Sequence, residues 1–296
     1  MSARVATVAS VGPAERVRAW VALMKPRIIE LLLITTVPAM VLAEGGWPDT
    51  WLVAATVIGG ALSAGGANAI NNVADRDIDA RMRRTAHRPL PAHRVSATEA
   101  LVVGAVAGTA GFVVLAAAVN LAAALLATGA LAFYVLVYTL LLKRTTAQNI
   151  VIGGAAGAVP VLVGWAAVTG GVALPAWILF AVIFFWTPPH FWALSLRFRD
   201  DYERAGVPML PVVAGERATI RQIGVYVVLL TGVSLLLQPV ADLGLVYLGA
   251  ASLLGAWFLV EVGRLSAAPG RALLVFRASN VYLTLLFAAV AVDVLV

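Results

Sequence analysis

The segment "NAINNVADRDIDARMRRTAHRP", Asn68 to Pro89, follows a long apolar stretch and becomes highly charged within a few residues. It contains three aspartates, Asp75, Asp77 and Asp79, with arginines between and after them. We interpret "NNVADRDID" as the last turns of an apolar helix, so the charged side chains gather where that helix ends. The position of this charge relative to the apolar segments decides the fold.

The composition indicates an integral membrane protein made of α-helices. The 296 residues are 61% hydrophobic and only 12% charged, whereas a soluble globular domain carries about 25% charged residues. Uncharged apolar runs recur along the chain, each close to the roughly 20 residues that a membrane-spanning helix needs. The absence of cysteine excludes disulfides and thiolate chemistry. We therefore predict an all-α, polytopic membrane protein that lies in the lipid bilayer.

Nine spanning helices are predicted from the apolar runs and from the turn signals between them. The breaks "EGGWPD", "TGG" and "PVADLG" are rich in Gly, Pro and Asp, which favour turns. The polar, arginine-containing N-terminus lacks the features of a signal peptide. We predict one membrane domain over residues 1–296, with residues 1–25 as a cytoplasmic tail. The predicted spans are 27–44, 51–74, 98–118, 121–142, 149–168, 173–196, 220–238, 243–263 and 276–295.

Lys and Arg residues are confined to alternate connections between these spans. All 21 of them lie in the N-terminal segment through Arg27, in the loops after the second, fourth, sixth and eighth spans, or, as Arg221 and Arg277, in the first turn of the span that follows such a loop. Cytoplasmic loops of membrane proteins carry an excess of Lys and Arg. We predict a multi-pass protein of the cell membrane with a cytoplasmic N-terminus and an outside C-terminus. The net charge of +6 would suit nucleic acid, but its distribution over short loops argues against that partner.

Acidic residues gather on the same side, at the ends of the second and sixth spans. These spans are four apart and therefore run in the same direction, which is the pattern of a parallel internal repeat. We predict two four-helix halves with a ninth helix appended. Small residues four apart, Gly104 and Gly108 in one half and Gly153 and Gly157 in the other, predict close helix packing.

The first acidic motif has the residue types and the spacing of a magnesium site. Asn71, Asp75 and Asp79 are four residues apart and share one helix face, with about 12 Å between the outer two. Like charges at this spacing repel each other unless a cation lies between them. Carboxylate and amide oxygens suit Mg²⁺, which is commonly shared with substrate phosphates, and the neighbouring arginines suit phosphate. The motif, flanked by Asn68 and Asn72, therefore predicts a Mg²⁺–diphosphate site.

Two simpler interpretations stand beside this one. The first motif could be a solvated loop that only fixes the topology, although aspartates and asparagines add nothing to that role. Asp77 lies on a different helix face from Asp75 and Asp79, and we expect it to be solvated. The second acidic segment, "LRFRDDYERAGVPMLP", could be a salt-bridged loop. Alternatively, a second Mg²⁺ on the same diphosphate could be held by its acids, Asp200, Asp201 and Glu203.

Four stretches of the chain resemble the UbiA superfamily of intramembrane prenyltransferases. The superfamily's first motif, Asn-Asp-x-x-Asp-x-x-x-Asp, is "NNVADRDID" here, so Asn72 replaces an acid. Its second motif, Asp-x-x-x-Asp, corresponds to "RFRDD", so Arg197 replaces the first acid and Asp201 is the second. Within the superfamily, "TPPHFWALSL" with "AGVPMLP" resembles the branch that farnesylates heme. The stretches are "LMKPRIIELLLITTVPAM", "GGANAINNVADRDIDARMRRTAHRPLP", "FFWTPPHFWALSLRFRDDYERAGVPMLPVV" and "FRASNVYLTLLF".

The resemblance implies a ring of nine helices around a cavity that opens toward the cytoplasm. It implies farnesyl diphosphate and protoheme IX as substrates, Mg²⁺ as the cofactor and a heme A synthase as a protein partner. The acids Asp75, Asp79 and Asp201 would be catalytic. The ligands implied for Mg²⁺ are these acids with Asn71 and Asn72. The other substrate contacts implied are Lys25, Arg27, Asn68, Arg76, Lys143, Arg144, His190, Arg197, Asp200 and Tyr202.

Histidines offer a second type of contact, to the porphyrin. His190 lies in the predicted sixth span beside Pro188 and Pro189, where a polar side chain usually faces a cavity. A contact with the heme iron or a propionate stands against a packing histidine near a proline kink. His87 and His93 lie in the basic loop and are further candidates for porphyrin or phosphate contact.

Three other functions fit parts of the sequence. A related prenyltransferase could act on a quinone precursor or chlorophyllide, but a fully acidic first motif and the absence of "TPPHFWAL" would favour it. A CDP-alcohol phosphotransferase also uses Mg²⁺ and membrane aspartates, yet needs an Asp-Gly-x-x-Ala-Arg arrangement that the sequence lacks. A non-enzymatic transporter would place charges at broken helices in the membrane midplane, whereas here the charges lie at helix ends.

Overall fold

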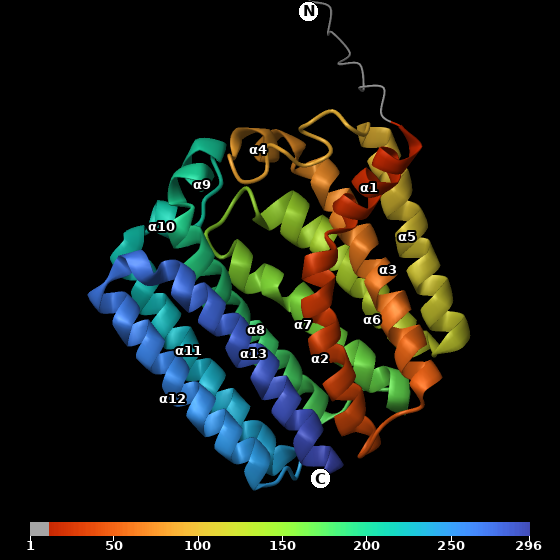
Figure 1. Ribbon diagram of the computed structural model, residues 1–296, viewed down its shortest axis with the longest axis vertical. Helices are drawn as coiled ribbons and strands as arrows, with labels where there is room; N and C mark the ends of the chain where they lie inside the picture. The colour runs from red at the N-terminus through yellow and green to blue at the C-terminus, as the bar shows by residue number, and fades with distance from the viewer. Residues whose placement is uncertain (1–11) are drawn as a thin grey trace, which may run out of the picture.

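The computed structural model describes residues 12–296, except for the side chains of residues 27–33, which lie outside the description. Within this range all regular structure is helical (Figure 1). The elements are α1 (Pro13–Met24), α2 (Pro26–Glu44), α3 (Thr50–Ala74), α4 (Arg76–Arg81), α5 (Ala97–Ala118), α6 (Leu121–Ala132), the π-helix η1 (Phe133–Leu142), α7 (Asn149–Thr169), α8 (Leu174–Arg197), α9 (Arg199–Ala205), α10 (Leu210–Val213), α11 (Gly215–Val240), α12 (Leu245–Ala267), the 3₁₀ helix η2 (Pro269–Arg271) and α13 (Ala272–Leu295).

Polar caps begin three of the spanning helices, one of them within the predicted turn "EGGWPD". The side chains of Asp49, Ser96 and Asn120 accept backbone N–H groups in the first turns of α3, α5 and α6, at 2.9, 3.1 and 2.9 Å. These N–H groups have no partner within the helix. Gly45 and Gly170 end α2 and α7 in the left-handed conformation, with φ of 71° and 76°, which glycine adopts without steric cost. Local sequence signals therefore set these helix boundaries.

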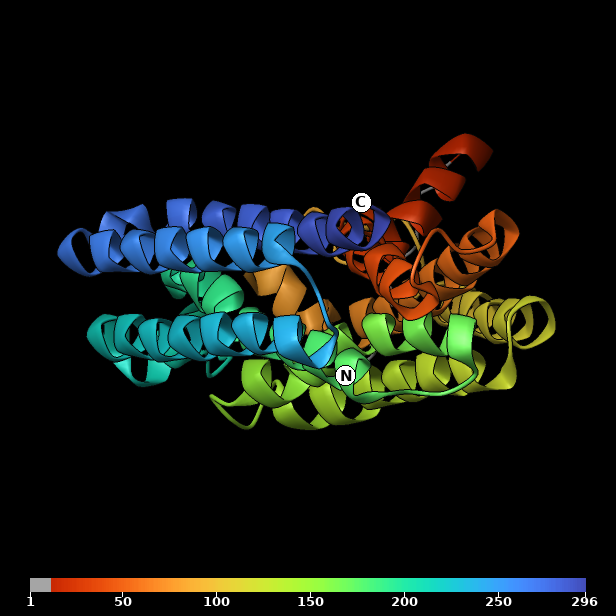
Figure 2. The same cartoon turned by 90° about the horizontal axis from the view of Figure 1, so that it is seen from below.

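The long helices form a closed ring (Figures 1 and 2). One half contains α2, α3, α5 and α6 with η1, and the other contains α7, α8, α11 and α12. The appended α13 packs against α12, α8 and α2, so it closes the ring. The short helices α4, α9 and α10 lie at the same end of the ring as α1, and the C-terminus lies at the other end (Figure 1). The predicted fold class is confirmed.

Eight helices of the described chain are long and apolar enough to cross a membrane. The part of α2 with described side chains, Ile34–Glu44, forms a shorter apolar helix, and the whole of α2 covers the first predicted span. Large apolar side chains such as Leu125, Val228 and Leu253 are exposed on these helices. Exposed apolar surface of this extent is unfavourable in water, so the helix exteriors suit lipid.

Residues 13–24 form helix α1, although the sequence predicts only a cytoplasmic tail there. Ala19 and Leu23 of α1 are buried, and α1 packs against α3 and α5. The Trp20 indole donates a hydrogen bond to Glu99 at the start of α5 (2.7 Å). Part of the predicted tail is therefore packed against the ring, next to the end of α3 that carries the first acidic motif.

The fourth span begins as α6 and ends as the π-helix η1. The backbone N–H of Lys143 donates to the carbonyl of Tyr138, five residues earlier, at 2.9 Å, which is the hydrogen-bond pattern of a π-helix. The Thr139 hydroxyl also donates to the carbonyl of Tyr134 (2.8 Å). Long π-helical segments are rare and often occur at functional sites. Here η1 contributes Tyr134 and Tyr138 to the wall of a cavity.

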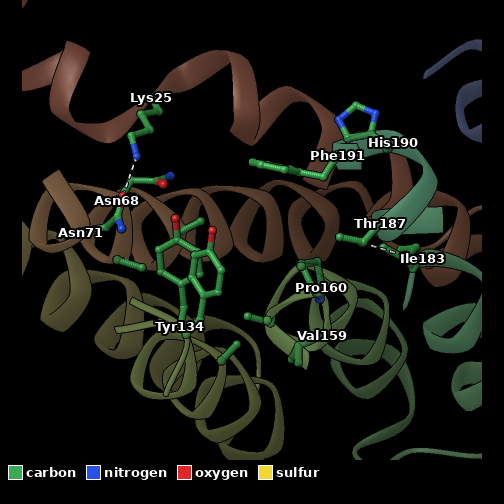
Figure 3. Close-up of a pocket in the computed structure, with 18 of the residues that line it drawn as sticks. Lys25, Asn68, Asn71, Tyr134, Val159, Pro160, Ile183, Thr187, His190 and Phe191 are labelled. Atoms are coloured by element: carbon green, nitrogen blue, oxygen red, sulfur yellow. Dashed lines mark hydrogen bonds between the residues drawn. The ribbon is translucent and has the colours of Figure 1, made fainter. Parts of the chain in front are cut away.

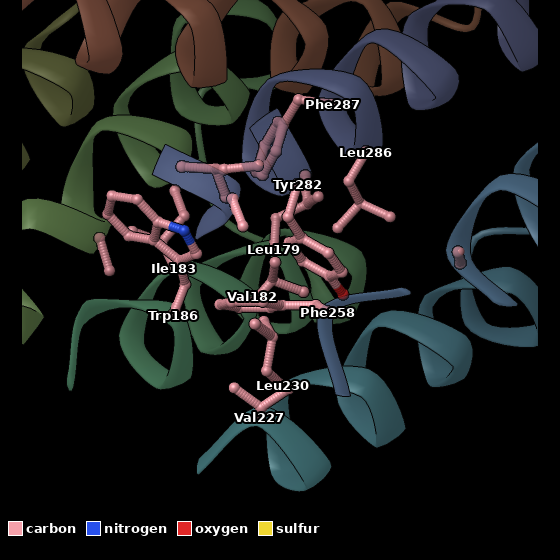
Figure 4. Packing of buried hydrophobic residues seen from close by; sticks show 14 of the residues in the cluster. Leu179, Val182, Ile183, Trp186, Val227, Leu230, Phe258, Tyr282, Leu286 and Phe287 are labelled. Atoms are coloured by element: carbon pink, nitrogen blue, oxygen red, sulfur yellow. The ribbon is translucent and has the colours of Figure 1, made fainter. Parts of the chain in front are cut away.

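Packing differs between the two sides of the ring. The helices α8, α11, α12 and α13 enclose a solid apolar core (Figure 4). Its largest buried rings include Phe258, Tyr282 and Phe287, and the Tyr282 hydroxyl forms a hydrogen bond with that of Ser234 (2.9 Å). The cavity lies instead among α2, α3, α6, η1, α7, α8 and α13. The second half therefore supports the wall of a site that opens mainly onto the first half.

Close packing of α3 and α5 depends on glycine, as predicted. A Cβ atom at Gly66 would lie 2.7 Å from the carbonyl oxygen of Gly104 and 2.7 Å from the backbone nitrogen of Gly108. In the other predicted pair, a Cβ at Gly153 would collide with the ring of Tyr138, whereas Gly157 has open space beside it and lines the cavity. The pair in α7 therefore serves the cavity wall as well as helix packing.

Candidate active site

A cavity of about 980 Å³ runs into the ring from the end where α4 and α9 lie. Lys25, Asn68 and Asn71 stand at one end of it, and Val159, Pro160 and Ile183 form apolar wall deeper in (Figure 3). Such a cavity has a polar mouth and an apolar interior. It suits a ligand with a charged head and a long hydrocarbon tail.

Asp75 caps the C-terminus of α3 and is fully buried. One carboxylate oxygen, Oδ2, forms an ion pair with Lys143 and accepts a hydrogen bond from the Asn71 amide at 2.8 Å. Asn71 in turn accepts a hydrogen bond from Lys25 at 2.8 Å. The other carboxylate oxygen, Oδ1, is buried and has no hydrogen-bond partner among the described residues. A buried carboxylate oxygen without a partner is costly, so Asp75 retains a free coordination position.

Asp79 lies one helical turn further on, in α4, and is also buried. Arg88 donates to both of its carboxylate oxygens, at 3.0 and 2.8 Å. Thr85 donates its hydroxyl to the Asp79 carbonyl at 3.0 Å. The loop after α4 therefore folds back onto the motif, and both Asp79 and Arg88 line the cavity.

Asp201 approaches from the other half, in α9, and is buried as well. It accepts from the backbone N–H of Arg84 at 3.4 Å and forms an ion pair with Arg204. The Arg84 guanidinium donates to the hydroxyl of Tyr202 at 3.4 Å. Arg84 and Tyr202 line the cavity, so the loop after the first motif joins the two acidic segments at one mouth.

Four cationic side chains line the mouth of the cavity, Lys25, Arg84, Arg88 and Lys143. Arg88 and Lys143 are paired with Asp79 and Asp75, whereas the side chains of Lys25 and Arg84 form no ion pair among the described residues, so the mouth carries an excess of positive charge. Burial, together with the neighbouring cations Arg88 and Lys143, lowers the pKa of Lys25 to about 7. Both causes disfavour the charged ammonium group, and an anion bound among these cations would favour it. The electrostatics therefore suit a polyanion such as a diphosphate.

The oxygen donors at the mouth fit Mg²⁺ only in combination with a ligand. Asp75 offers an unpartnered buried oxygen, and the carboxylates and amides present are ligand types that Mg²⁺ prefers. In the described chain, however, no group of three acidic or histidine side chains is close enough to hold a metal. Mg²⁺ is usually bound by one or two carboxylates with substrate phosphates. The residues therefore fit a metal shared with a diphosphate rather than an all-protein site.

Several predicted site residues lie away from the cavity. Arg144 forms a bidentate pair with Asp77 at the surface, at 2.7 and 2.9 Å, and this hydrogen bonding lowers the pKa of Asp77 to about 2. The Asn72 amide turns toward α1, donating to the Leu23 carbonyl at 2.9 Å. The side chain of Arg27 lies outside the described residues. The exposed predicted residues, which are not part of the cavity wall, are Arg76, Arg197 and Asp200.

Two aromatic residues of the site were not predicted from the sequence. Tyr134 and Tyr138 line the cavity beside the mouth, with ring centroids 5.3 Å apart. Lys143 lies 5.9 Å from the Tyr138 ring centroid. The signal that could have found them is their spacing of four residues on the helix that leads to Lys143, because that spacing places them on one face.

His190 lines the cavity from α8, between Trp186 and Phe276 (Figure 3 shows its position). Its Nδ1 atom forms a hydrogen bond with the hydroxyl of Ser279 on α13, at 2.8 Å. His87 and His93 are exposed in the loop before α5 and do not line this cavity. Of the three histidines, His190 is the one in the cavity wall.

Comparisons with known proteins agree with this geometry. The sequence profile of the UbiA prenyltransferase family matches residues 32–291. A protoheme IX farnesyltransferase from Parafrankia sp. is 55% identical over 282 residues, which cover 94% of this chain and 90% of that protein. One from Frankia casuarinae is 56% identical over 286 residues, covering 95% and 99%. One from Gloeobacter violaceus is 53% identical over 274 residues, covering 92% and 90%.

Solved structures share the fold at lower identity. A UbiA homologue from Aeropyrum pernix K1 superposes with a TM-score of 0.71 at 24% identity, covering 91% of this chain and 98% of that one. A UbiA homologue from Archaeoglobus fulgidus, bound to GPP and Mg²⁺, superposes with a TM-score of 0.65 at 16% identity, covering 92% and 99%. At these identities the likeness concerns the fold.

Proposed function

The chain belongs to the UbiA prenyltransferase family, and we propose that it transfers the farnesyl group of farnesyl diphosphate to a vinyl group of protoheme IX. Relatives that are about 55% identical over nearly the whole chain are named for this reaction. The observation that carries the proposal is the cavity of about 980 Å³ with its charged mouth and apolar depth. A prenyl diphosphate needs both environments at once.

The diphosphate is held at the mouth by the cations around it. Lys25 and Lys143 supply ammonium groups, while Arg84 and Arg88 supply planar guanidinium groups that can pair with two phosphate oxygens. Asp75 and Asp79 from the first half, with Asn71 beside them, and Asp201 from the second would hold Mg²⁺ between themselves and the phosphates. Bound there, Mg²⁺ stabilises the charge that develops on the departing diphosphate.

The cavity wall protects the allylic cation that forms when the carbon–oxygen bond breaks. Tyr134 and Tyr138 present ring faces near the mouth, where electron-rich rings attract a cation. Val159, Pro160 and Ile183 surround the space beyond them with apolar groups, which receive the isoprenoid tail and exclude water. The heme vinyl group attacks the cation, and addition of water with loss of a proton gives a hydroxyethylfarnesyl side chain.

The membrane setting follows from the helices and the charge distribution. The chain is a multi-pass membrane protein. We place the mouth on the cytoplasmic side of the cell membrane because every Lys and Arg of the sequence lies on that side in the nine-span arrangement. A heme A synthase would take up the product, and we propose association with such an enzyme because the product is an apolar heme.

Purified protein in lipid nanodiscs tests the proposed function. With farnesyl diphosphate, Mg²⁺ and protoheme IX, mass spectrometry should detect protoheme carrying an added farnesyl group and water. EDTA should stop the reaction, and geranyl and geranylgeranyl diphosphate should be poorer donors. Prenylation of a quinone precursor or chlorophyllide, with protoheme IX unchanged under the same conditions, would overturn the proposal.

A further inference from the structure

The imidazole of His190 is fixed in its plane by aromatic rings from two helices. The Trp186 ring lies 4.2 Å from it at an interplanar angle of 25°, and the Phe276 ring lies 4.5 Å from it at 34°. At these centroid distances each ring lies over a face of the imidazole, the Trp186 ring stacked on it and the Phe276 ring tilted. His190 therefore keeps one ring plane, anchored to both α8 and α13.

The rotation of the imidazole within that plane is fixed by Ser279. The fully buried Ser279 lies 2.8 Å from His190 Nδ1 through its hydroxyl. The same hydroxyl donates to the carbonyl of Phe276 at 2.7 Å, and the Trp186 indole donates to the carbonyl of Ser279 at 2.7 Å. Ser279 thus connects the histidine to the Phe276 backbone and to the Trp186 indole.

This network accommodates one tautomer of His190 with every partner satisfied. A neutral imidazole carries one N–H donor and one acceptor nitrogen. We assign the single hydroxyl hydrogen of Ser279 to the Phe276 carbonyl, 2.7 Å away, and the Ser279 oxygen then accepts from Nδ1–H of His190. A proton on Nε2 would instead lack an acceptor, since no hydrogen bond to Nε2 occurs among the described residues. The lone pair therefore resides on Nε2, and the cavity is the open space that His190 borders.

We propose that His190 binds the porphyrin iron through Nε2 and that Ser279 is a positioning residue for this bond. The inference rests on the proposed function, since it requires protoheme IX in the cavity. Histidine ligands of metals almost always donate their second ring N–H to a partner that fixes the ring, and histidine is a common ligand of heme iron. His190 with Ser279 has this arrangement, without a metal site of its own in the protein.

The tautomer also argues against a propionate contact. A carboxylate accepts hydrogen bonds, whereas Nε2 with a lone pair has no proton to donate. The lining residues next to His190 on α8 and those on α13, among them Thr187, Phe191, Asn280 and Leu283, are uncharged and offer a propionate no compensating charge. An electron-poor metal is the part of the porphyrin that suits Nε2. Ligation would hold the porphyrin at the level of His190, about two helical turns from the end of α8 at Arg197. The diphosphate would stay at the mouth.

Comparison of two porphyrins separates iron ligation from general packing. The affinity of purified protein in nanodiscs for protoheme IX and for metal-free protoporphyrin IX is measured without farnesyl diphosphate. Wild type should prefer protoheme by at least about tenfold. In His190→Ala this preference should vanish through weaker protoheme binding, with the affinity for protoporphyrin IX unchanged. Added imidazole should restore the wild-type absorption spectrum of bound heme.

The positioning role of Ser279 is tested by substitution, with Ser195 as a matched control serine. Ser279→Ala should weaken protoheme binding by about tenfold, as loss of a ligand's hydrogen-bond partner does, and should shift the heme absorption spectrum. Ser279→Thr keeps the hydroxyl and should restore both. Ser195→Ala removes a buried hydroxyl of α8 whose hydrogen bond, among the described residues, is to the Trp192 carbonyl, and it should change neither.

Two results distinguish failure of this inference from failure of the proposed function. If His190→Ala loses affinity for both porphyrins equally, or if its heme absorption spectrum is unchanged, while wild type still farnesylates protoheme IX, iron ligation is overturned and the proposed function stands. If wild type binds neither porphyrin and does not farnesylate protoheme IX, both the proposed function and the proposed iron ligation are wrong.

Discussion

The two acidic segments occupy equivalent places in the internal repeat, yet their surroundings differ. Each follows a spanning helix of its half, α3 or α8, at the same end of the ring. In the first segment both Asp75 and Asp79 are buried. In the second, of the two adjacent aspartates, Asp201 is buried and Asp200 is exposed. The repeat therefore reproduces the position of the acids without reproducing their chemistry.

The source of the neutralising cations explains this difference. The first segment is paired with Lys143 and Arg88, which come from other elements. In the second segment, Asp201 pairs with Arg204 of its own short helix. The second segment also depends on the first through Arg84, which contacts Asp201 and Tyr202. The first segment thus forms the main binding surface, and the second supports it.

The largest expected effect comes from the first segment. Asp75→Asn should lower the rate of farnesyl transfer by more than about tenfold, because it removes a buried charge that would face the metal and the phosphates. The rate is measured by mass spectrometry of the heme product, with protein folding checked by thermal unfolding in detergent. Asp77→Asn, two residues away and at the surface, is the control and should keep its activity. Near-normal turnover of Asp75→Asn would contradict the metal assignment.

A smaller effect is expected from the second segment, and it also tests the register of the motif. Asp201→Asn should raise the KM for farnesyl diphosphate by roughly tenfold, the cost of losing one charged contact, and should raise the Mg²⁺ concentration needed for half-maximal rate. Asp200→Asn should change neither, because Asp200 is exposed. If Asp200→Asn abolishes activity and Asp201→Asn does not, the register is wrong by one residue.

Arg84 tests the link between the segments. Arg84→Ala should raise the KM for farnesyl diphosphate several-fold, because it removes a cation of the mouth and the contact with Tyr202. Its effect should not add to that of Tyr202→Phe, because the Arg84 guanidinium donates to the Tyr202 hydroxyl, and the coupling energy should be about 0.5–3 kcal/mol as for residues in one network. Arg83→Ala at an exposed position is the control. Additive effects of the two substitutions would mean that the segments act independently.

The smallest effect is expected at the surface pair of Asp77 and Arg144. Both side chains are largely exposed, so Asp77→Asn should cost only about 0.5 kcal/mol of stability at pH 7. The pKa of Asp77 is lowered to about 2, so the contribution is present above the ordinary value of about 3.9 and is lost as pH falls toward 2. Melting curves of both proteins should converge over that range. A stability difference that persists at pH 2 would contradict this origin.

The spans were predictable from the sequence because hydropathy and the positions of Lys and Arg are local signals. That Asn71, Asp75 and Asp79 share one face followed from helical spacing, whereas their burial did not. The position of Arg88 was not predictable, since it depends on how the loop after α4 folds back onto Asp79. Burial of Asp201 beside exposed Asp200 depends likewise on contacts with Arg84. The π-helical turns that place Tyr138 in the wall arise from packing, which hydropathy does not report.

Mass spectrometry of hemes from a strain that cannot make heme O tests the proposed reaction most directly. Expression of the wild-type chain should yield a heme heavier than protoheme IX by one farnesyl group and one water. Expression of Asp75→Asn at equal membrane abundance should yield little of it. Recovery of protoheme IX alone from cells with wild-type protein in the membrane would contradict farnesyl transfer to heme at this cavity.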